Sequence, residues 1–120
     1  MALIRLDSST KEQYVERNAV SSVRQKNSTT AELILNIGWK MDVDDTYANV
    51  KAILENPEFI PFYTAIIDAP GMTNTAIDPR NLAAVVEKGV TTCEILMNDG
   101  RKLQSAVSAA SAAAALGYLA

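Results

Sequence analysis

An internal repeat constrains this chain more than any other feature of its sequence. Residues 29–41 align with residues 91–103 at an offset of 62, and the aligned segments share a central Asn-X-Gly. The identical pairs are Thr29/Thr91, Thr30/Thr92, Glu32/Glu94, Asn36/Asn98, Gly38/Gly100 and Lys40/Lys102. Upstream, Arg17-Asn18 matches Arg80-Asn81 at an offset of 63. The change from 63 to 62 predicts that the second copy lacks one residue near Gly89. Since a repeat of this kind corresponds to one structural unit, we expect two tandem copies of a small unit.

Each copy carries the pattern of a β-hairpin. In the first copy, apolar residues occupy alternate positions at Leu33, Leu35, Trp39 and Met41, as in strands with one buried face. A three-residue loop that ends in Gly38 suits a left-handed backbone at its last residue. This loop pairs Leu35 with Trp39 and Leu33 with Met41, so that all four side chains lie on one face.

Further elements surround each hairpin. We expect strands at residues 2–6, 14–24, 64–68 and 82–87, and helices that begin after Asp44-Asp45-Thr46 and after Ser108. The first helix ends at Asn56-Pro57, and the second covers residues 109–116 before Gly117. The predicted fold class is α+β and mainly β, with two tandem copies of a small β-sheet or barrel-like unit related by a pseudo-two-fold axis.

The predicted domain organisation follows the repeat. Residues 1–56 form the first unit, residues 57–61 connect the units, and residues 62–120 form the second. A unit of this size is marginal alone, so we expect the two to pack as one compact body.

Charge and composition narrow the classes of partner. The net charge is −3, with 11 basic and 14 acidic residues, and neither half carries a cationic stripe. We therefore expect no nucleic-acid partner. The apolar stretch at residues 106–120 is too short to span a bilayer, and the N-terminus has too short an apolar run for a signal peptide. We expect no membrane partner and a cytoplasmic location at synthesis.

The residues that usually carry catalysis or bind metals are scarce. Histidine is absent, and the one cysteine, Cys93, falls at an inward position of a predicted strand. The acidic residues at 42–45 lack the full ligand set of a calcium loop and are better explained as a helix cap. Asp68 and Asp78 stand beside prolines in predicted turns. We expect no catalytic residues, no metal site and no cofactor.

Two family resemblances appear in these segments. The strand from Tyr14 through Val23, the hairpin of residues 30–43 and the helix led by Asp44-Asp45 resemble small proteins of the flagellar FlbD type and short phage-encoded proteins. That resemblance implies a regulatory or structural binding module and transfers no functional residue; the second copy departs from it at Asp78-Pro79. The segment of residues 50–68 is similar to a helix–strand segment of STAS-like proteins, which implies an α/β fold with a mixed sheet.

These observations favour a non-enzymatic protein that binds other proteins. Trp39, Arg101 and Tyr118 are the candidate interface residues. The leading hypothesis is a phage virion component, such as a capsid-stabilising or decoration protein, located in the virion and present as a homo-oligomer or in many copies. One alternative is a small regulator that binds a host or phage enzyme, and another is a STAS-like ligand-sensing domain. The alanine-rich C-terminal helix packs either in the chain or between subunits.

Overall fold

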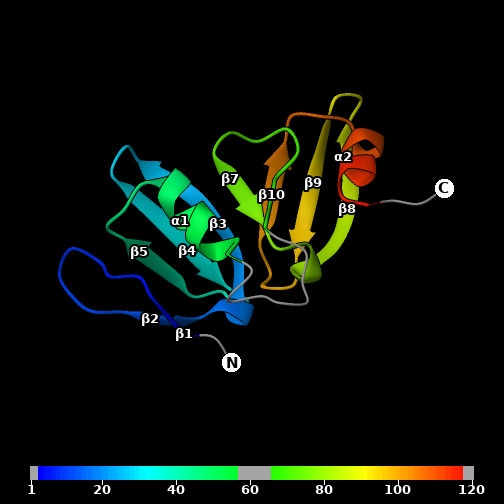
Figure 1. Ribbon diagram of the computed structural model, residues 1–120. Helices are drawn as coiled ribbons and strands as arrows, with labels where there is room; N and C mark the ends of the chain where they lie inside the picture. The colour runs from blue at the N-terminus through cyan, green and yellow to red at the C-terminus, as the bar shows by residue number, and fades with distance from the viewer. Residues whose placement is uncertain (1–2, 57–65, 118–120) are drawn as a thin grey trace.

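The structure is a computed structural model that describes residues 3–56 and 66–117. The predicted connector at residues 57–61 and the candidate interface residue Tyr118 lie outside the described residues. The elements of the first half are β1 (Leu3–Arg5), β2 (Tyr14–Glu16), the 3₁₀ helix η1 (Arg17–Ala19), β3 (Val20–Asn27), β4 (Thr30–Leu35), β5 (Lys40–Val43) and α1 (Tyr47–Leu54). Those of the second half are β6 (Ile67–Asp68), β7 (Thr75–Ile77), the 3₁₀ helix η2 (Pro79–Asn81), β8 (Leu82–Gly89), β9 (Thr92–Met97), β10 (Lys102–Ser105) and α2 (Ala109–Ala115) (Figure 1).

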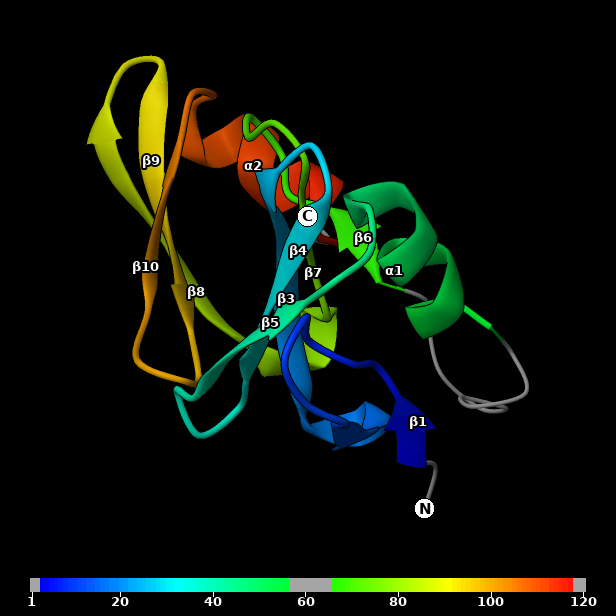
Figure 2. The same ribbon diagram turned by 90° about the vertical axis from the view of Figure 1, so that its left-hand side faces the viewer.

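The strands form three antiparallel sheets. Their strand orders are β1-β2, β10-β9-β8 and β5-β4-β3-β7-β6. Figure 2 shows the hairpin sheet of each half beside its own helix. The fold is α+β and mainly β, as predicted. The mixed sheet implied by the STAS-like resemblance is wrong, because every pairing among the described strands is antiparallel.

The two halves follow the same order of elements, and from η1 onward the spacing between equivalent elements is constant. β3 begins at Val20 and β8 at Leu82, 62 residues later, and the same spacing separates η1 from η2, β4 from β9 and α1 from α2. The expected missing residue near Gly89 is therefore wrong. Ile4 pairs with Val15, and Ile67 pairs with Ile77, so the shorter connection lies between β6 and β7.

The hairpin predictions are confirmed. Leu33 pairs with Met41, and the Leu35 N–H donates to the Trp39 carbonyl at 2.8 Å. Gly38 closes the three-residue loop with φ 85°, and Gly100 does so in the second half with φ 90°. A glycine at these positions avoids the contact between Cβ and the backbone that a positive φ imposes on other residues.

The helix starts are also confirmed, whereas one strand prediction is wrong. The hydroxyl of Thr46 accepts from the Asn49 N–H, and that of Ser108 accepts from the Ser111 N–H, so both residues cap their helices. The predicted single strand over residues 14–24 is broken by η1. Glu16 causes the break because its carboxylate accepts from the Asn18 N–H and turns the chain.

The core has one cluster in each half. The first cluster contains Ile4, Leu6, Val15, Val20, Val23, Ala31, Leu33, Val43, Val50, Leu54, Ile66 and Ala76. The second contains Ala69, Ile77, Cys93, Ile95, Met97, Leu103 and Ala112, so Cys93 is a buried core residue as expected. Ile66 and Ala76 come from the second half of the chain and complete the first cluster.

Strand pairing joins the halves in one direction only: the second half adds a strand to the sheet of the first, and the first adds no described strand to the sheet of the second. β7 pairs with β3, but β2 pairs only with β1 among the described strands. A pseudo-two-fold axis would pair β2 with β8 in the same way, so that prediction is wrong. The β1–β2 hairpin instead packs on the core of its own half through Ile4 and Val15.

Candidate functional site

The most distinctive surface feature is an open groove between the loop that joins β1 to β2 and the strand β5. Its volume is about 490 Å³. The groove is lined by Ser8, Ser9, Thr10, Lys11, Gln13, Trp39, Lys40, Met41 and Asp42, and we call this set the β5 groove. In Figure 1 the loop and β5 lie side by side at the end of the molecule away from α2. A smaller hollow of about 170 Å³ continues past Ser9 and Asp42 to Lys26.

The loop is held against β5 by hydrogen bonds from both of its ends. The Asp44 N–H donates to the Asp7 carbonyl at 2.8 Å, and the Gln13 side-chain amide donates to the Asp42 carbonyl at 2.8 Å. Within the loop, the Ser8 hydroxyl accepts from the Lys11 N–H at 3.2 Å. These bonds fix the loop in one conformation, so the groove is formed before any ligand arrives.

The charges in and around the groove are unevenly paired. The Lys26 ammonium neutralises the Asp42 carboxylate at 2.7 Å, and Arg5 lies 3.1 Å from Asp7. The hydrogen bond from Arg5 lowers the pKa of Asp7. Lys11 and Lys40, by contrast, form no ion pair with any described carboxylate. Two free cations therefore lie in the groove beside carboxylates whose charge is already met.

Trp39 forms one wall of the groove. It lies just after the tip of the β4–β5 hairpin, and 65% of its surface is exposed. Ile37 at the same tip is 78% exposed. The Trp39 indole is therefore accessible on the surface, and its role in a protein interface remains a prediction.

Arg101, the equivalent residue in the second half, has a different environment. Its guanidinium donates to the Ser22 hydroxyl at 3.2 Å, and its backbone N–H donates to the Asp99 carboxylate. Arg101 is partly buried and joins the tip of the β9–β10 hairpin to β3. The structure therefore brings Trp39 into the groove and does not bring Arg101 there.

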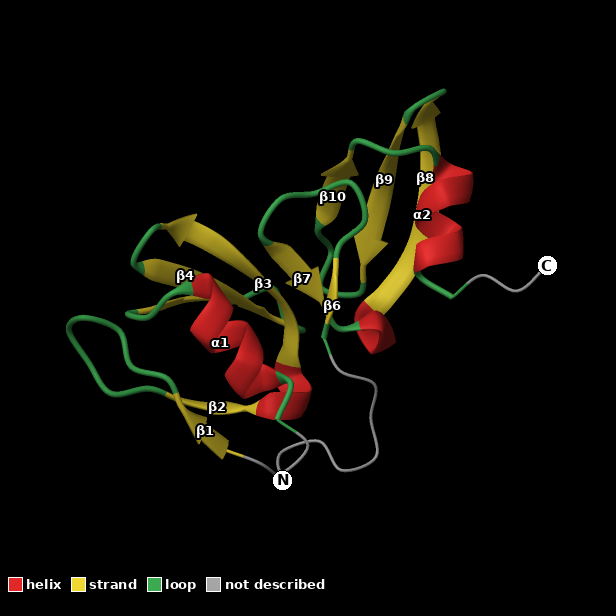
Figure 3. Cartoon of the chain, turned by 45° about the horizontal axis from the view of Figure 1, so that its top comes forward, coloured by secondary structure: helices red, strands yellow, loops and turns green. Residues whose placement is uncertain are grey.

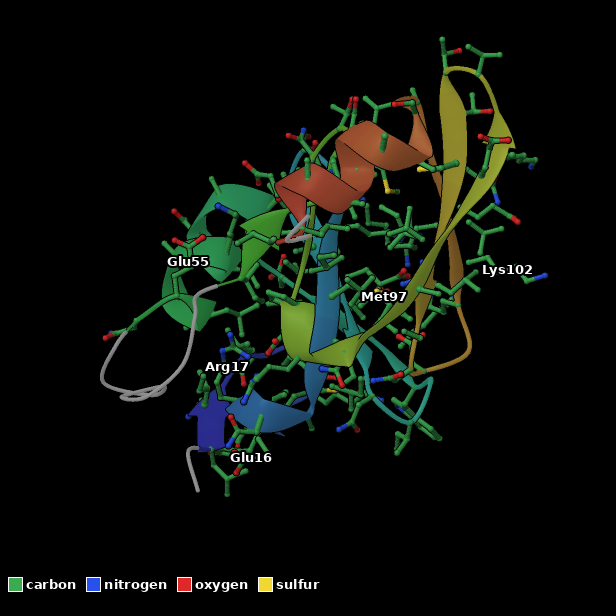
Figure 4. The ribbon with its side chains drawn as sticks, turned by 90° about the vertical axis from the view of Figure 1, so that its right-hand side faces the viewer. Glu16, Arg17, Glu55, Met97 and Lys102 are labelled. Carbon is green, nitrogen blue, oxygen red and sulfur yellow. The ribbon has the colours of Figure 1, made fainter. Side chains whose placement is uncertain are left out.

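A buried ion cluster joins the halves at another place. Arg17 and Asp78 have fully buried side chains 3.3 Å apart, and Arg80 lies 2.6 Å from the same carboxylate. The Arg17 Nε also donates to the Leu54 carbonyl at 2.7 Å. Figure 4 shows Arg17 beside η1, below the end of α1 marked by Glu55. No pattern in the sequence predicted this contact, because its partners are 61 residues apart.

The protonation of this cluster follows from burial and pairing. Burial alone would raise the pKa of Asp78, but the hydrogen bonds and charge of Arg80, together with the charge of Arg17, lower it overall. Burial lowers the pKa of the Arg17 guanidinium, which Asp78 partly offsets. Within the described residues, the cluster joins η1 and the end of α1 to the start of η2.

Other expected absences can be checked only in the described part of the chain. There, no group of three His, Cys, Asp or Glu side chains is placed to hold a metal ion. In residues 3–56 and 66–117, no helix is long and apolar enough to cross a membrane.

The fold has a counterpart among solved structures, in the class of small β-rich DNA-binding domains. The match is the LytTr DNA-binding domain of a methyl-accepting/DNA response regulator from Bacillus cereus. It has a TM-score of 0.66 and 13% sequence identity, and it covers 98% of this chain and 99% of that one. At this identity the similarity establishes the fold alone. No family model matches the chain, and no curated protein does.

Two expectations from the sequence are corrected by this match. A phage virion component with capsid partners is wrong, because the whole chain has the fold of a DNA-binding domain. The exclusion of nucleic acid is contradicted by the same finding. Net charge was a poor guide because it does not show where charges lie: Lys11 and Lys40 lie together in the β5 groove, without an ion pair to a described carboxylate.

Proposed function

We propose that this protein is a DNA-binding module that contacts double-stranded DNA through the β5 groove. The observation that carries the proposal is the convergence of Lys11, Lys40 and Trp39 on one preformed, open groove. The full-length likeness to a LytTr DNA-binding domain supports it at the level of fold. The function is binding without chemistry, in the compartment that holds DNA, which fits the expected cytoplasmic location.

Each part of the groove has a role in this proposal. The ammonium groups of Lys11 and Lys40 contact phosphates, and the hydroxyls of Ser9 and Thr10 add hydrogen bonds to the same backbone. Trp39 presents a flat apolar surface that packs on a deoxyribose or on a thymine methyl group. The lysines position the module on the duplex, and Trp39 supplies the apolar contact to a sugar or a base.

The charges also set the strength of binding. Two lysines neutralise two phosphates, so the logarithm of the binding constant falls against the logarithm of salt concentration with a slope of about −2. The exposed carboxylate of Asp44 in the smaller hollow repels phosphate and keeps the affinity low. We therefore expect modest affinity from a single module, with strong binding only where several modules act together.

We further propose that the chain arose by duplication of one unit, with residues 1–56 and 62–120 as the copies and residues 57–61 as the connector. The shared order of elements and the constant spacing of 62 residues support this proposal. The same two register shifts in β3 and β8 support it as well. Only the first copy has a tryptophan at its hairpin tip, so the copies have separate roles.

Trp39 makes the proposal directly testable because it is the one tryptophan of the chain. Its fluorescence should change when duplex DNA of mixed sequence is titrated in at low salt. The double variant K11A/K40A should weaken binding about tenfold or more while keeping the reporter, since each phosphate contact contributes to affinity.

The control removes the same charge elsewhere. Lys88 on β8 and Lys102 on β10 are exposed, and Figure 4 shows Lys102 pointing away from the ribbon. K88A/K102A should bind as the unchanged protein does. An equal loss of DNA affinity in both double variants would show that binding depends on net charge alone. An unchanged affinity of K11A/K40A would refute the groove as the DNA contact.

A further inference from the structure

The outer edge of β8 is an open sheet edge with apolar side chains. β8 ends the sheet β10-β9-β8, and it is the outermost strand of that sheet in Figures 1 and 3. The Leu82 N–H at its start donates to the Pro79 carbonyl, and among the described residues no other backbone hydrogen bond of β8 goes beyond those to β9. Val86 is 44% exposed there. Exposed apolar edges of this kind pair readily with another strand.

The equivalent edge in the first half is occupied. β3 corresponds to β8, and its outer edge pairs with β7 through Ser22↔Ile77, Val23↔Ala76 and Arg24↔Thr75. Further hydrogen bonds join the same edge to the flanking residues, including one from the Asp78 N–H to the Ser21 carbonyl at 2.9 Å. One edge is thus closed by a strand from the next unit along the chain, and the other is not.

The missing strand has a measurable effect on burial. Val20, Val23 and Leu54 in the first half are fully buried. Their counterparts 62 residues later are Leu82, Val85 and Leu116, and all three are only partly buried. The first set is covered by Ile66 and Ala76, which arrive with β6 and β7. The second set is an equivalent core that lacks this cover.

A matching pair of side chains is exposed on the β1–β2 hairpin. The pair Ile4↔Val15 in the first hairpin is equivalent to the pair Ile67↔Ile77 in the second. In this alignment Leu3 corresponds to Ile66, and Tyr14 corresponds to Ala76. Ile66 is 2% exposed and Ala76 is fully buried, whereas Leu3 is 58% and Tyr14 is 55% exposed. The first hairpin therefore presents apolar groups at the two positions that the second hairpin inserts into a neighbouring core.

We propose that the outer edge of β8 binds the β1–β2 hairpin of a second copy of this chain. The pairing of β7 with β3 sets the register, so Ala84 pairs with Val15, Val85 with Tyr14 and Val86 with Gln13 of the second copy. Leu3 and Tyr14 then cover Leu82, Val85 and Leu116. One strand joins the sheet edge, and two exposed apolar side chains enter the incompletely covered core.

The occupant belongs to another molecule because the chain cannot reach its own edge. The β1–β2 hairpin of the same chain is packed on the core of the first half through Ile4 and Val15, whereas β8 lies in the second half (Figure 1). The contact is therefore head-to-tail, with two different surfaces, and it generates rings or filaments instead of a two-fold dimer unless two chains exchange hairpins.

The first test is the dependence of molecular mass on concentration, measured by sedimentation velocity. The full chain should form multiples of 12.9 kDa as the concentration rises. L3S/Y14S should raise the dissociation constant about 100-fold, because two apolar side chains no longer become buried. I37S removes an apolar residue that is even more exposed, at the tip of the β4–β5 hairpin, and should leave association unchanged.

The second test fixes the register, in a Cys93→Ala background. Chains carrying Y14C are mixed with chains carrying V85C and oxidised, because directly paired strand residues lie within disulfide reach. A covalent dimer should form from this mixture and not from I37C mixed with V85C. A protein that stays monomeric at all concentrations would overturn the proposal. So would an oligomer insensitive to L3S/Y14S, or one without the Y14C–V85C crosslink.

Discussion

Asp78 is the residue on which the joint between the halves depends. Its carboxylate meets Arg17 from the first half and Arg80 from its own half, and it also accepts from the Arg80 N–H at 3.0 Å. One nitrogen of Arg17, Nη2, is buried without a hydrogen-bond partner. The cluster is therefore already short of acceptors, and any loss of charge at Asp78 leaves a buried guanidinium uncompensated.

The Asp78→Asn variant should lower the free energy of unfolding by about 3–5 kcal/mol, as expected when one partner of a buried ion pair is removed. Urea denaturation at pH 7 measures this difference. Asp44→Asn changes an exposed carboxylate and should alter stability little. Equal stabilities for Asp78→Asn and the unchanged protein would show that Arg17 finds another acceptor.

The pH dependence of the same difference has a defined sign. Because the folded state lowers the pKa of Asp78 from its ordinary value of 3.8, the ionised carboxylate stabilises the fold above that value. The contribution should be lost as the pH falls below 3.8 towards the folded pKa. The stability gap between the unchanged protein and Asp78→Asn should therefore be flat near neutrality and narrow in acid.

At the scale of elements, the two helices hold their places by different means. α1 buries Val50 and Leu54 in the first core cluster, and Thr46 caps it. α2 consists of alanine and serine, and of its residues only Ala112 is buried. Alanine favours the helical conformation but buries little area, so tertiary packing stabilises α2 less than α1.

Amide hydrogen exchange should separate the helices. In dilute protein, the N–H groups of residues 112–115 in α2 should exchange faster than those of residues 50–53 in α1, because local opening of α2 exposes less apolar surface. Equal protection of the two helices from exchange in dilute protein would contradict the inference that the second core cluster is incompletely covered.

For the whole molecule, β6 and β7 decide how the halves cooperate. These strands belong to the second half of the chain but lie in the sheet of the first. They bring Ile66 and Ala76 to the first core and place Asp78 beside Arg17. The first half therefore depends on the second for its sheet edge, part of its core and its buried countercharge.

A fragment of residues 1–61 should fail to fold by itself. It lacks the strand that closes β3 and the carboxylate that neutralises Arg17, so its thermal unfolding followed by circular dichroism should show no cooperative transition. The full chain, as the control, should unfold in one transition. A folded fragment with well-dispersed amide signals in an NMR spectrum would refute this dependence.

Local features were predictable because neighbouring residues decide them. The hairpin register follows from the alternation of Leu33, Leu35, Trp39 and Met41 together with the need for glycine at residue 38. The helix starts follow from hydroxyl side chains that reach a backbone N–H three residues later. These are short-range effects of sterics and hydrogen bonding, and the sequence by itself determined them.

The rest was decided only in the tertiary structure. That β7 closes β3, that Arg17 meets Asp78 and that Lys11 joins Lys40 and Trp39 in one groove all depend on segments distant in the chain. A strand's own residues do not specify which segment pairs with its edge, so the sequence did not show that β3 is covered by β7 whereas β8 is open among the described residues. Net charge likewise hides which ions are paired, because pairing is a matter of distance in the folded protein.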